Sequence, residues 1–398
     1  MKKLLMATAA TALTAGAAVA GSHGSEAKIG VILGFTGPIE SLTPHMADSA
    51  ELALSEINET GKFLGGMTLT PVRADSTCID SAAASAAAER LITTDGVVGI
   101  MGADCSGVTG AVLANVAMPN GVPMISPSAT SPALSTAEDN DLFFRTAPSD
   151  ARQGDVLANV LTDKGINEVA VTYTNNDYGK GFADAFIAAY EGLGGSVTAN
   201  VPHEDGKADY SAEVGALASA GGDVLVVLGY SDQGGKGVIQ AALDTGAFDT
   251  FAMGDGMYSD ALLADLGADL EGSFGTLPWS EGEGTEAFAA LAEAAGVNAE
   301  SSFTRESYDA AALLALAAAK AGEASAAGIA ANILDVANAP GEPILPGELG
   351  KALDIIADGG DVDYVGATNV ELIGPGEAAG TYREYTVTGG VYETVQFR

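Results

Sequence analysis

The sequence predicts an α/β fold in two lobes, each a mostly parallel sheet flanked by helices. Three observations support this fold class. Short apolar runs of strand length alternate with amphipathic segments of helix length over residues 28–126. The same alternation starts again after Pro148, and strands that alternate with helices form parallel sheets covered on both faces. The chain also has 398 residues, a length that favours two domains over one.

The first block of this pattern alternates between strand and helix. We expect strands at residues 28–35, 68–74, 97–101 and 122–126. We expect helices at residues 44–58, 80–92 and 106–118. The first helix carries Met46, Ala50, Leu54 and Ile57 on one face, because these residues recur every three or four positions. Asp80 is expected to cap the second helix, since its carboxylate can accept hydrogen bonds from the free first-turn amides.

The second block repeats the pattern and then becomes less regular. We expect strands at residues 169–173, 196–201 and 224–228, and helices at residues 179–193, 210–220 and 235–245. Beyond them we expect a short strand at 251–254, helices at 286–295 and 302–322, and β-structure at 370–373, 382–387 and 391–395. The run at 224–228 is apolar throughout, which is typical of a strand buried on both faces.

The first 20 residues have the pattern of a secretory signal peptide. Lys2 and Lys3 form a basic start, an apolar run follows, and residues 18–20 (AVA) fit the small-residue cleavage rule. We therefore expect export to the periplasm, with a mature chain that begins near Gly21. The residue directly after this cleavage site is Gly21 and not a cysteine, so a lipid-anchored N-terminus is not expected.

The charge balance excludes some partners. The chain has 17 Lys and Arg against 53 Asp and Glu, a net charge of −36. Nucleic-acid binding depends largely on Lys and Arg that neutralise phosphates, so we expect no nucleic-acid partner and no affinity for anionic bilayers. High net charge also opposes self-association, and we expect a monomer.

The chain has two cysteines, Cys78 and Cys105. In an exported protein such a pair favours a disulfide over two free thiols. The loop between them has about 28 residues, for which chain-entropy estimates give roughly 3–4 kcal/mol of stabilisation. The alternative, a metal site, lacks nearby ligands, and we expect no metal and no cofactor.

Enzymatic motifs are weak. The glycine-rich segment 229–237 fails the GxxxxGK[ST] spacing of a phosphate loop. Ser106 stands between a strand and a helix as a nucleophile would, but its surroundings do not fit GxSxG. Only His45 and His203 could act as its base. We therefore expect no catalytic residue and no enzyme.

Hydroxyl residues at the ends of strands fit ligand binding better. Ser106 and Thr130 follow two neighbouring predicted strands, and their hydroxyls, with backbone amides at a helix start, could hold a ligand carboxylate. The alternative is that Ser106 and Ser128 only cap helices or turns, which is common for serine. The two roles do not exclude each other.

Several motifs carry a family resemblance. They are residues 34–38 (GFTGP), 73–78 (RADSTC), 105–106 (CS), 124–132 (MISPSATSP) and 176–179 (NDYG). They resemble the periplasmic leucine/isoleucine/valine-binding proteins, the type I substrate-binding components of ABC importers. The resemblance implies the two-lobe fold of periplasmic binding proteins of type I, with a hinge of several crossovers. It divides the chain into an N-terminal lobe of residues 27–147 and 277–354, and a C-terminal lobe of residues 148–276 and 355–398.

The resemblance also implies a binding site. It assigns the ligand carboxylate to Ser106, Thr130 and the backbone of Ser128. It assigns an aromatic wall on the second lobe to Tyr178 and Tyr230.

The same resemblance assigns the ligand ammonium to Asp255 and the family's disulfide to Cys78 and Cys105. Two positions depart from the family pattern. The acidic position is usually Glu in branched-chain binders, and Asp255 is one methylene shorter. Leu42 or a neighbour stands where the family tends to place an aromatic residue.

The resemblance therefore implies a protein that binds a small amino acid, branched-chain or otherwise apolar, and delivers it to the membrane permease of an ABC importer. Closure of the two lobes would remove water from the ligand's charges. The alternatives are a binder of another small acid or amide in the same family, and an amino-acid-sensing module that signals to a receptor.

Overall fold

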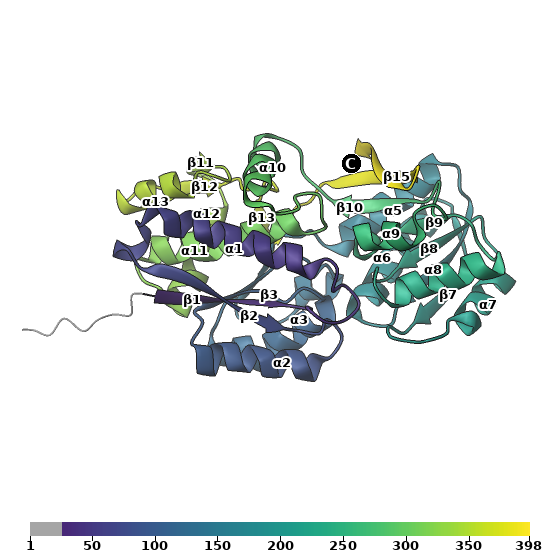
Figure 1. Cartoon of the computed structure of the whole chain (residues 1–398), viewed down its shortest axis with the longest axis horizontal. Helices are drawn as coiled ribbons and strands as arrows, with labels where there is room; N and C mark the ends of the chain where they lie inside the picture. Colours follow the sequence, from purple (N-terminus) through teal and green to yellow (C-terminus); the bar gives the residue numbers. More distant parts are fainter. Residues whose placement is uncertain (1–25) are drawn as a thin grey trace, which may run out of the picture.

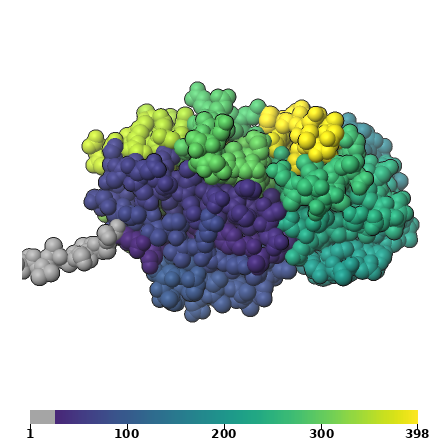
Figure 2. Space-filling view, in the orientation of Figure 1, coloured from purple at the N-terminus to yellow at the C-terminus, as the bar shows by residue number. Residues whose placement is uncertain are grey.

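The computed structural model describes residues 26–398 as two lobes side by side, one holding the purple N-terminal strands and the other the teal middle of the chain (Figure 1). The expected signal peptide, residues 1–20, lies outside the described residues. Figure 2 shows the purple part of the first lobe directly against the teal second lobe. The architecture confirms the predicted two-lobe α/β class.

The first lobe is built on a seven-stranded sheet. Its spatial order is β13 (Leu372–Ile373), β14 (Glu377–Ala378), β5 (Phe143–Arg145), β4 (Met124–Ser126), β3 (Gly99–Gly102), β1 (Glu26–Leu33) and β2 (Thr68–Asp75). All neighbours pair in parallel except β13 and β14. A separate parallel pair joins β11 (Glu342–Ile344) to β12 (Val362–Tyr364).

Helices pack around the first sheet. They are α1 (Thr43–Thr60), α2 (Ser81–Arg90), α3 (Ser106–Val112), α4 (Met118–Asn120), α10 (Glu283–Ala295), α11 (Thr304–Ala321), α12 (Ala326–Ala337) and α13 (Leu349–Ala357). Asp80 caps α2 as predicted, because its carboxylate accepts hydrogen bonds of 3.0 Å from the amides of Ala82 and Ala83.

The second lobe repeats the plan. Its sheet order is β16 (Val391–Phe397), β15 (Tyr382–Thr388), β10 (Phe274–Pro278), β9 (Phe251–Met253), β8 (Val224–Leu228), β6 (Glu168–Thr174) and β7 (Ser196–His203). Only the pairs made by β15 are antiparallel. Its helices are α5 (Asp150–Asp163), α6 (Asp177–Gly192), α7 (Ser211–Ala220), α8 (Gly234–Thr245) and α9 (Asp260–Leu266).

Helix α11 forms the centre of the first lobe. Residues 304–318 of this helix are all buried, which explains its alanine-rich, apolar sequence. Close packing also requires a small residue beneath it, since a Cβ at Gly99 would lie only 3.0 Å from Leu314 Cδ2. Within residues 26–398 no single helix is both long and apolar enough to cross a membrane, although α11 and α12, bent by 108°, would together pass that test.

The chain passes between the two sheets three times, at residues 146–149, 279–282 and 379–381. The second and third crossings are joined, because the Trp279 amide donates to the Thr381 carbonyl oxygen at 2.9 Å. The indole ring of Trp279 also lies between two guanidinium groups, 3.4 Å from Arg305 of α11 and 3.7 Å from Arg383 of β15. These contacts tie both lobes to the hinge.

The last crossing lies at residues 379–381, whereas we expected the chain to enter the second lobe between residues 354 and 355. Strands β13 and β14 belong to the first sheet, where Glu377 pairs with Arg145 of β5. The segment at 370–373 was expected as a strand of the second lobe, but it contributes only the two residues of β13 to the first. We therefore propose that the C-terminal lobe resumes at about residue 379, as the crossing at 379–381 indicates.

Candidate functional site

The predicted site residues lie at the carboxyl ends of strands in both sheets. Ser106 begins α3 after β3, and Ser128 and Thr130 lie in the loop after β4. Tyr178 stands in the first turn of α6 after β6, and Tyr230 follows β8. Asp255 follows β9 and begins the 3₁₀ turn Asp255–Met257. In open parallel sheets such strand ends are where ligands bind.

A small cavity between the lobes collects most of these residues. Its volume is about 20 Å³, room for about one water molecule. It is lined by Ile39, Leu42, Met46, Asp104, Cys105, Ser106, Ser128, Tyr178, Tyr230, Asp255, Gly256 and Phe303. Five of the six predicted residues are present, and Thr130 lies outside this lining. A ligand larger than water therefore enters only when the lobes or these side chains move apart.

The first-lobe wall is held by a disulfide and a buried carboxylate. Cys78 and Cys105 form a disulfide, as predicted, with their Cα atoms 5.1 Å apart. The adjacent Asp104 carboxylate accepts from the Gly34 amide at 2.6 Å and from the Ser76 hydroxyl at 2.8 Å. Burial raises the pKa of Asp104 despite these donors. The disulfide and this carboxylate join the segment before Ser106 to the loops that follow β1 and β2.

The hydroxyls of this wall are partly engaged within the protein. The Ser131 amide donates to Ser106 Oγ at 3.0 Å, and the Ser128 hydroxyl donates to the Asp104 carbonyl at 3.0 Å. Helix α3 begins without a side-chain cap, so neither bond is the helix or turn cap that we weighed for these serines, and each bond instead joins two loops. Within residues 26–398 the Ser106 O–H donates to no other group, so it remains available to a ligand. Thr130 is buried, and its Oγ1 has no hydrogen-bond partner among residues 26–398.

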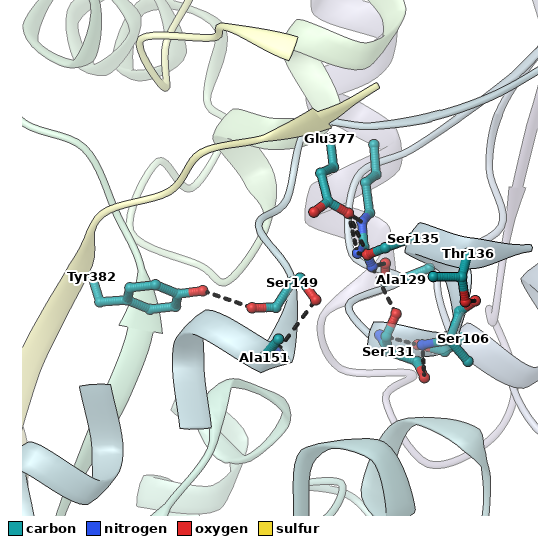
Figure 3. A network of polar contacts seen from close by, with 11 residues as sticks. Ser106, Ala129, Ser131, Ser135, Thr136, Ser149, Ala151, Glu377 and Tyr382 are labelled. Atoms are coloured by element: carbon teal, nitrogen blue, oxygen red, sulfur yellow. Dashed lines mark hydrogen bonds and ion pairs between the residues drawn. The ribbon is translucent and has the colours of Figure 1, made fainter. Parts of the chain in front are cut away.

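Arg145 positions the loop that carries Ser128 and Thr130. This buried guanidinium donates from Nη1 to the carbonyl oxygens of Ala129 at 2.9 Å and Ser131 at 3.0 Å. It also pairs with Glu377 of β14 at 2.5 Å. Figure 3 shows Glu377, Ser135, Ala129, Ser131 and Ser106 in one continuous network. The two-residue strand β14 thus supports the first-lobe wall of the site.

The second-lobe wall is aromatic and acidic. The rings of Tyr178 and Tyr230 stack with centroids 5.2 Å apart. The Tyr178 hydroxyl donates to Asp255 Oδ1 at 3.0 Å, and the Gly256 amide donates to the same hydroxyl oxygen at 3.3 Å. Asp255 is 2% exposed, and burial raises its pKa to about 6 even though Tyr178 lowers it. A cation at this position would find a poorly solvated carboxylate held in place.

Sequence reasoning missed a second buried acid, Asp150, at the start of α5. Its amide donates to the Thr130 carbonyl at 2.8 Å, yet neither carboxylate oxygen has a partner in the described part of the chain. Burial, and then the charge of Asp255, raise the pKa of Asp150 well above its usual value. An Asp in the first turn of a helix is common because its charge favours the helix N-terminus. The sequence therefore gave no indication that Asp150 lies near the ligand site.

Polar contacts join the two lobes beside the cavity. The Ser41 amide and hydroxyl donate to the Asp232 carboxylate at 2.8 and 2.9 Å, and the Asp232 amide donates to the Pro38 carbonyl at 3.0 Å. On the other side, the Ser131 hydroxyl donates to the Asp177 carbonyl at 2.9 Å. These bonds hold the lobes together around the cavity.

Comparison with known proteins identifies the family. Residues 26–347 match the family model described as periplasmic binding protein. The Leu/Ile/Val-binding protein BraC3 of Rhizobium johnstonii is 30% identical over 336 residues, which cover 83% of this chain and 89% of that protein. The chain belongs to the Leu/Ile/Val-binding family of periplasmic binding proteins.

Two further relatives support the assignment to this family. Leu/Ile/Val-binding protein homolog 3 of Brucella melitensis is 35% identical over 236 residues, 59% of this chain and 62% of that relative. The chemotactic signal transduction system substrate-binding protein BasB of Halobacterium salinarum is 29% identical over 382 residues, 93% of this chain and 89% of that protein. Family members are solute-binding proteins, which confirms the expectation that the chain is not an enzyme.

Solved structures confirm the fold. The leucine-binding protein LivK of Thermotoga maritima has a TM-score of 0.77 at 23% identity, covering 93% of this chain and 98% of that one. A solute-binding protein of R. palustris in complex with 4-hydroxybenzoate has a TM-score of 0.74 at 20% identity, covering 94% and 97%. Both structures share the fold of this chain.

Apolar side chains form part of the cavity lining. Leu42 lines it, and Ile39, Met46 and Phe303, which sequence reasoning did not name, add apolar surface around it. Phe303 precedes α11 and has a left-handed backbone with φ of 60°. A positive φ is uncommon for a bulky residue, and local sequence patterns do not predict it.

Proposed function

We propose that the protein is an extracytoplasmic solute-binding protein of an ABC importer that binds a small, branched-chain or otherwise apolar amino acid. The observation that carries this proposal is the interlobe cavity, with a buried carboxylate, Asp255, on one wall and hydroxyls, Ser106 and Ser128, on the other. An α-amino acid presents an ammonium and a carboxylate at one end. The names of the Leu/Ile/Val-binding relatives support this ligand class.

Each wall has a proposed role. Ser106, Thr130 and the backbone of Ser128 hold the carboxylate, and Asp255 pairs with the ammonium. A site built around such groups rejects ligands that lack either one, because its own buried polar groups would then lack partners.

The remaining lining defines the ligand side chain. Tyr178 and Tyr230 form an aromatic wall, and Ile39, Leu42, Met46 and Phe303 present apolar surface. These groups offer few partners for a charged side chain. An aliphatic side chain buried there would contribute about 25 cal/mol for each Å² removed from water.

Delivery to a membrane permease follows from the same proposal. Family membership is consistent with a periplasmic protein, and residues 1–20 have the pattern of a cleaved signal peptide. We expect the exported chain to act as a monomer that closes on its ligand and docks on the permease.

Two alternatives have specific support. The likeness to BasB favours an amino-acid-sensing module that reports to a chemotactic receptor. The structure with bound 4-hydroxybenzoate favours another small acid or amide. Asp255 opposes a simple carboxylic acid as the ligand, since an acid without an amine would leave this buried carboxylate without a cation.

A thermal-shift screen tests the proposal. The panel contains L-leucine, L-isoleucine, L-valine, 4-hydroxybenzoate and the corresponding amides. We expect the amino acids alone to raise the melting temperature, because a ligand at 100 times its Kd stabilises the folded state by about 2.7 kcal/mol. Stabilisation by 4-hydroxybenzoate or amides, with no effect of any amino acid, would contradict the proposal.

A further inference from the structure

A second cavity lies at the hinge, apart from the cavity between the lobes. Its volume is about 150 Å³, enough for several water molecules or a small organic molecule. The first crossing lines it with Thr146 and Pro148, the second with Trp279 and Ser280, and the third with residues 379–381. Among the described residues, the linings of the two cavities share none. A molecule bound in the hinge cavity would therefore contact all three crossings without occupying the proposed amino-acid site.

The hinge cavity contains a buried carboxyl group that the proposed function does not use. Glu306, in the first turn of α11, lines this cavity and is 4% exposed. Among residues 26–398 no other residue donates a hydrogen bond to its carboxyl group. Burial raises the pKa of Glu306 to about 8. Native proteins rarely leave a buried polar group without a partner, so this one calls for an explanation.

The charged groups around this carboxyl group do not provide the partner. Arg305 lowers its pKa, while Asp309 and Asp255 raise it as further negative charges. Arg305 is itself paired with Glu300 at 3.3 Å, and Arg383 of β15 pairs with the same carboxylate at 3.1 Å. The nearby cations are therefore engaged elsewhere, and the surroundings of the buried carboxyl group favour an additional positive charge.

Three hydroxyl groups of the same lining can act toward a ligand only as acceptors. Those of Thr146, Ser280 and Thr381 donate to backbone carbonyl oxygens at 2.8, 2.5 and 2.5 Å. A hydroxyl has a single hydrogen to donate, and its oxygen keeps lone pairs that can accept. A ligand that matches these hydroxyls must therefore bring N–H or O–H donors.

We propose that the hinge cavity binds a small primary alkylammonium ion. Such an ion brings three N–H donors and the positive charge that Glu306 lacks, and the hydroxyls accept the hydrogen bonds that remain. Pro148, Pro278 and Ala378 in the lining present apolar surface to a short alkyl chain. Water molecules would supply donors but no charge, so they would leave an ionised carboxylate unpaired. This site is separate from the amino-acid site and does not depend on the proposed function.

Binding to this site should depend on pH. Without the ion, most Glu306 carboxyl groups keep a proton at pH 7, since their pKa is about 8. An ammonium ion favours the ionised carboxylate, so its binding displaces this proton to the solvent. The alkylammonium ion itself stays charged at pH 8, as a lysine side chain does. We therefore expect the affinity to rise at least tenfold between pH 6 and pH 8.

A thermal-shift titration of the mature protein with n-propylammonium chloride tests this inference. Sodium chloride at equal ionic strength and 1-propanol are the controls, because they supply only the salt or only the uncharged alkyl chain. We expect a saturable rise of the melting temperature at pH 8 with the ammonium salt alone. The absence of a saturable rise, an equal rise with 1-propanol, or equal affinity at pH 6 and pH 8 would overturn the inference.

Three variants test the position of the ion. Glu306→Gln keeps the shape of the neutral acid, so it should fold, and we expect it to lose the thermal shift. Ser280→Ala removes one acceptor and keeps the carboxyl group, so it should weaken binding at least threefold. Glu281→Gln is the matched control, because Glu281 is an exposed acid next to Ser280, and it should behave like wild type.

Asp255→Asn separates this site from the cavity between the lobes. We expect this variant to keep the shift caused by n-propylammonium, because Asp255 does not line the hinge cavity. Retention of the shift in Glu306→Gln, or its loss in Asp255→Asn or Glu281→Gln, would overturn the assignment to the hinge. Failure of the wild-type protein to bind amino acids would contradict the proposed function, whereas the shift with n-propylammonium at the hinge would still be expected.

Discussion

Replacement of Asp255 by asparagine should remove ligand binding and yet stabilise the unliganded protein. The carboxylate is buried, and its pKa is raised from 3.8 to about 6 in the folded chain. A raised folded pKa for an acid means that folding opposes its ionisation. This penalty is largest above pH 6 and disappears as the pH falls toward the unfolded pKa.

The size of the effect follows from the two pKa values. The difference between 3.8 and about 6 corresponds to about 3 kcal/mol at 1.36 kcal/mol per pH unit. The asparagine side chain would keep an oxygen that accepts from Tyr178, so the substitution removes the charge and keeps the hydrogen bond. We expect Asp255→Asn to raise the free energy of unfolding by up to about 3 kcal/mol at pH 8, and by less than 1 kcal/mol at pH 4.

The affinity for the ligand should fall in Asp255→Asn, although the stability rises. Removal of one partner from a buried charge pair costs about 2–5 kcal/mol, which is roughly 30-fold to several thousand-fold in Kd. Urea denaturation at pH 4 and pH 8 measures the stability, and calorimetry with L-leucine measures the affinity. Greater stability with lost affinity would show that this acid is maintained for ligand binding at the expense of stability.

Asp309→Asn provides a matched control for this experiment. Asp309 is also buried with a pKa of about 6, but it accepts hydrogen bonds from the Tyr364 hydroxyl at 2.8 Å and from the amides of Ala367 and Thr368 at 2.8 and 3.0 Å. The NH₂ group of the substituted side chain would face these donors, and each donor left without a partner costs about 1–3 kcal/mol, which offsets the gain from removing the charge. This variant should therefore gain no stability at pH 8, and if Asp255→Asn gained none either, the reasoning from its pKa would be refuted.

Two further predictions concern the scaffold of the site. Replacement of Cys78 and Cys105 by alanine should lower the free energy of unfolding by roughly 3–4 kcal/mol, as expected for a disulfide that closes a loop of this length, and urea denaturation with and without reductant measures it. An equal effect of reductant on the wild type and the double variant would contradict this. Ser41→Ala should weaken the contact with Asp232 between the lobes, because it removes the hydroxyl bond, and raise the radius of gyration of the unliganded protein in small-angle scattering. An unchanged radius would show that this bond does not hold the lobes closed.

Local patterns were enough to predict much of the fold and of the cavity. Hydrophobic periodicity located most strands that carry site residues. The family resemblance then assigned Ser106, Tyr178 and Asp255, which the structure brings to one cavity. The Asp80 cap was predicted for a local reason, whereas the Cys78–Cys105 disulfide was predicted from the cysteine count of an expected exported chain and from the family resemblance.

The missing parts depend on long-range contacts. Helix α5 and strand β5 were not predicted, and β14 has only two residues whose pairing with β5 links positions 377 and 145. Periodicity in a short window cannot show such a pair. Asp150 was missed for the same reason, since its importance depends on Asp255, which lies far along the chain after β9.

A calorimetric comparison of L-leucine with 4-methylpentanoate tests the central claim most directly. The two compounds share the carboxylate and the aliphatic chain, and they differ only in the amine that we assign to Asp255. The account predicts binding of leucine and a loss of at least a hundredfold in affinity for 4-methylpentanoate. Equal or tighter binding of 4-methylpentanoate would contradict it.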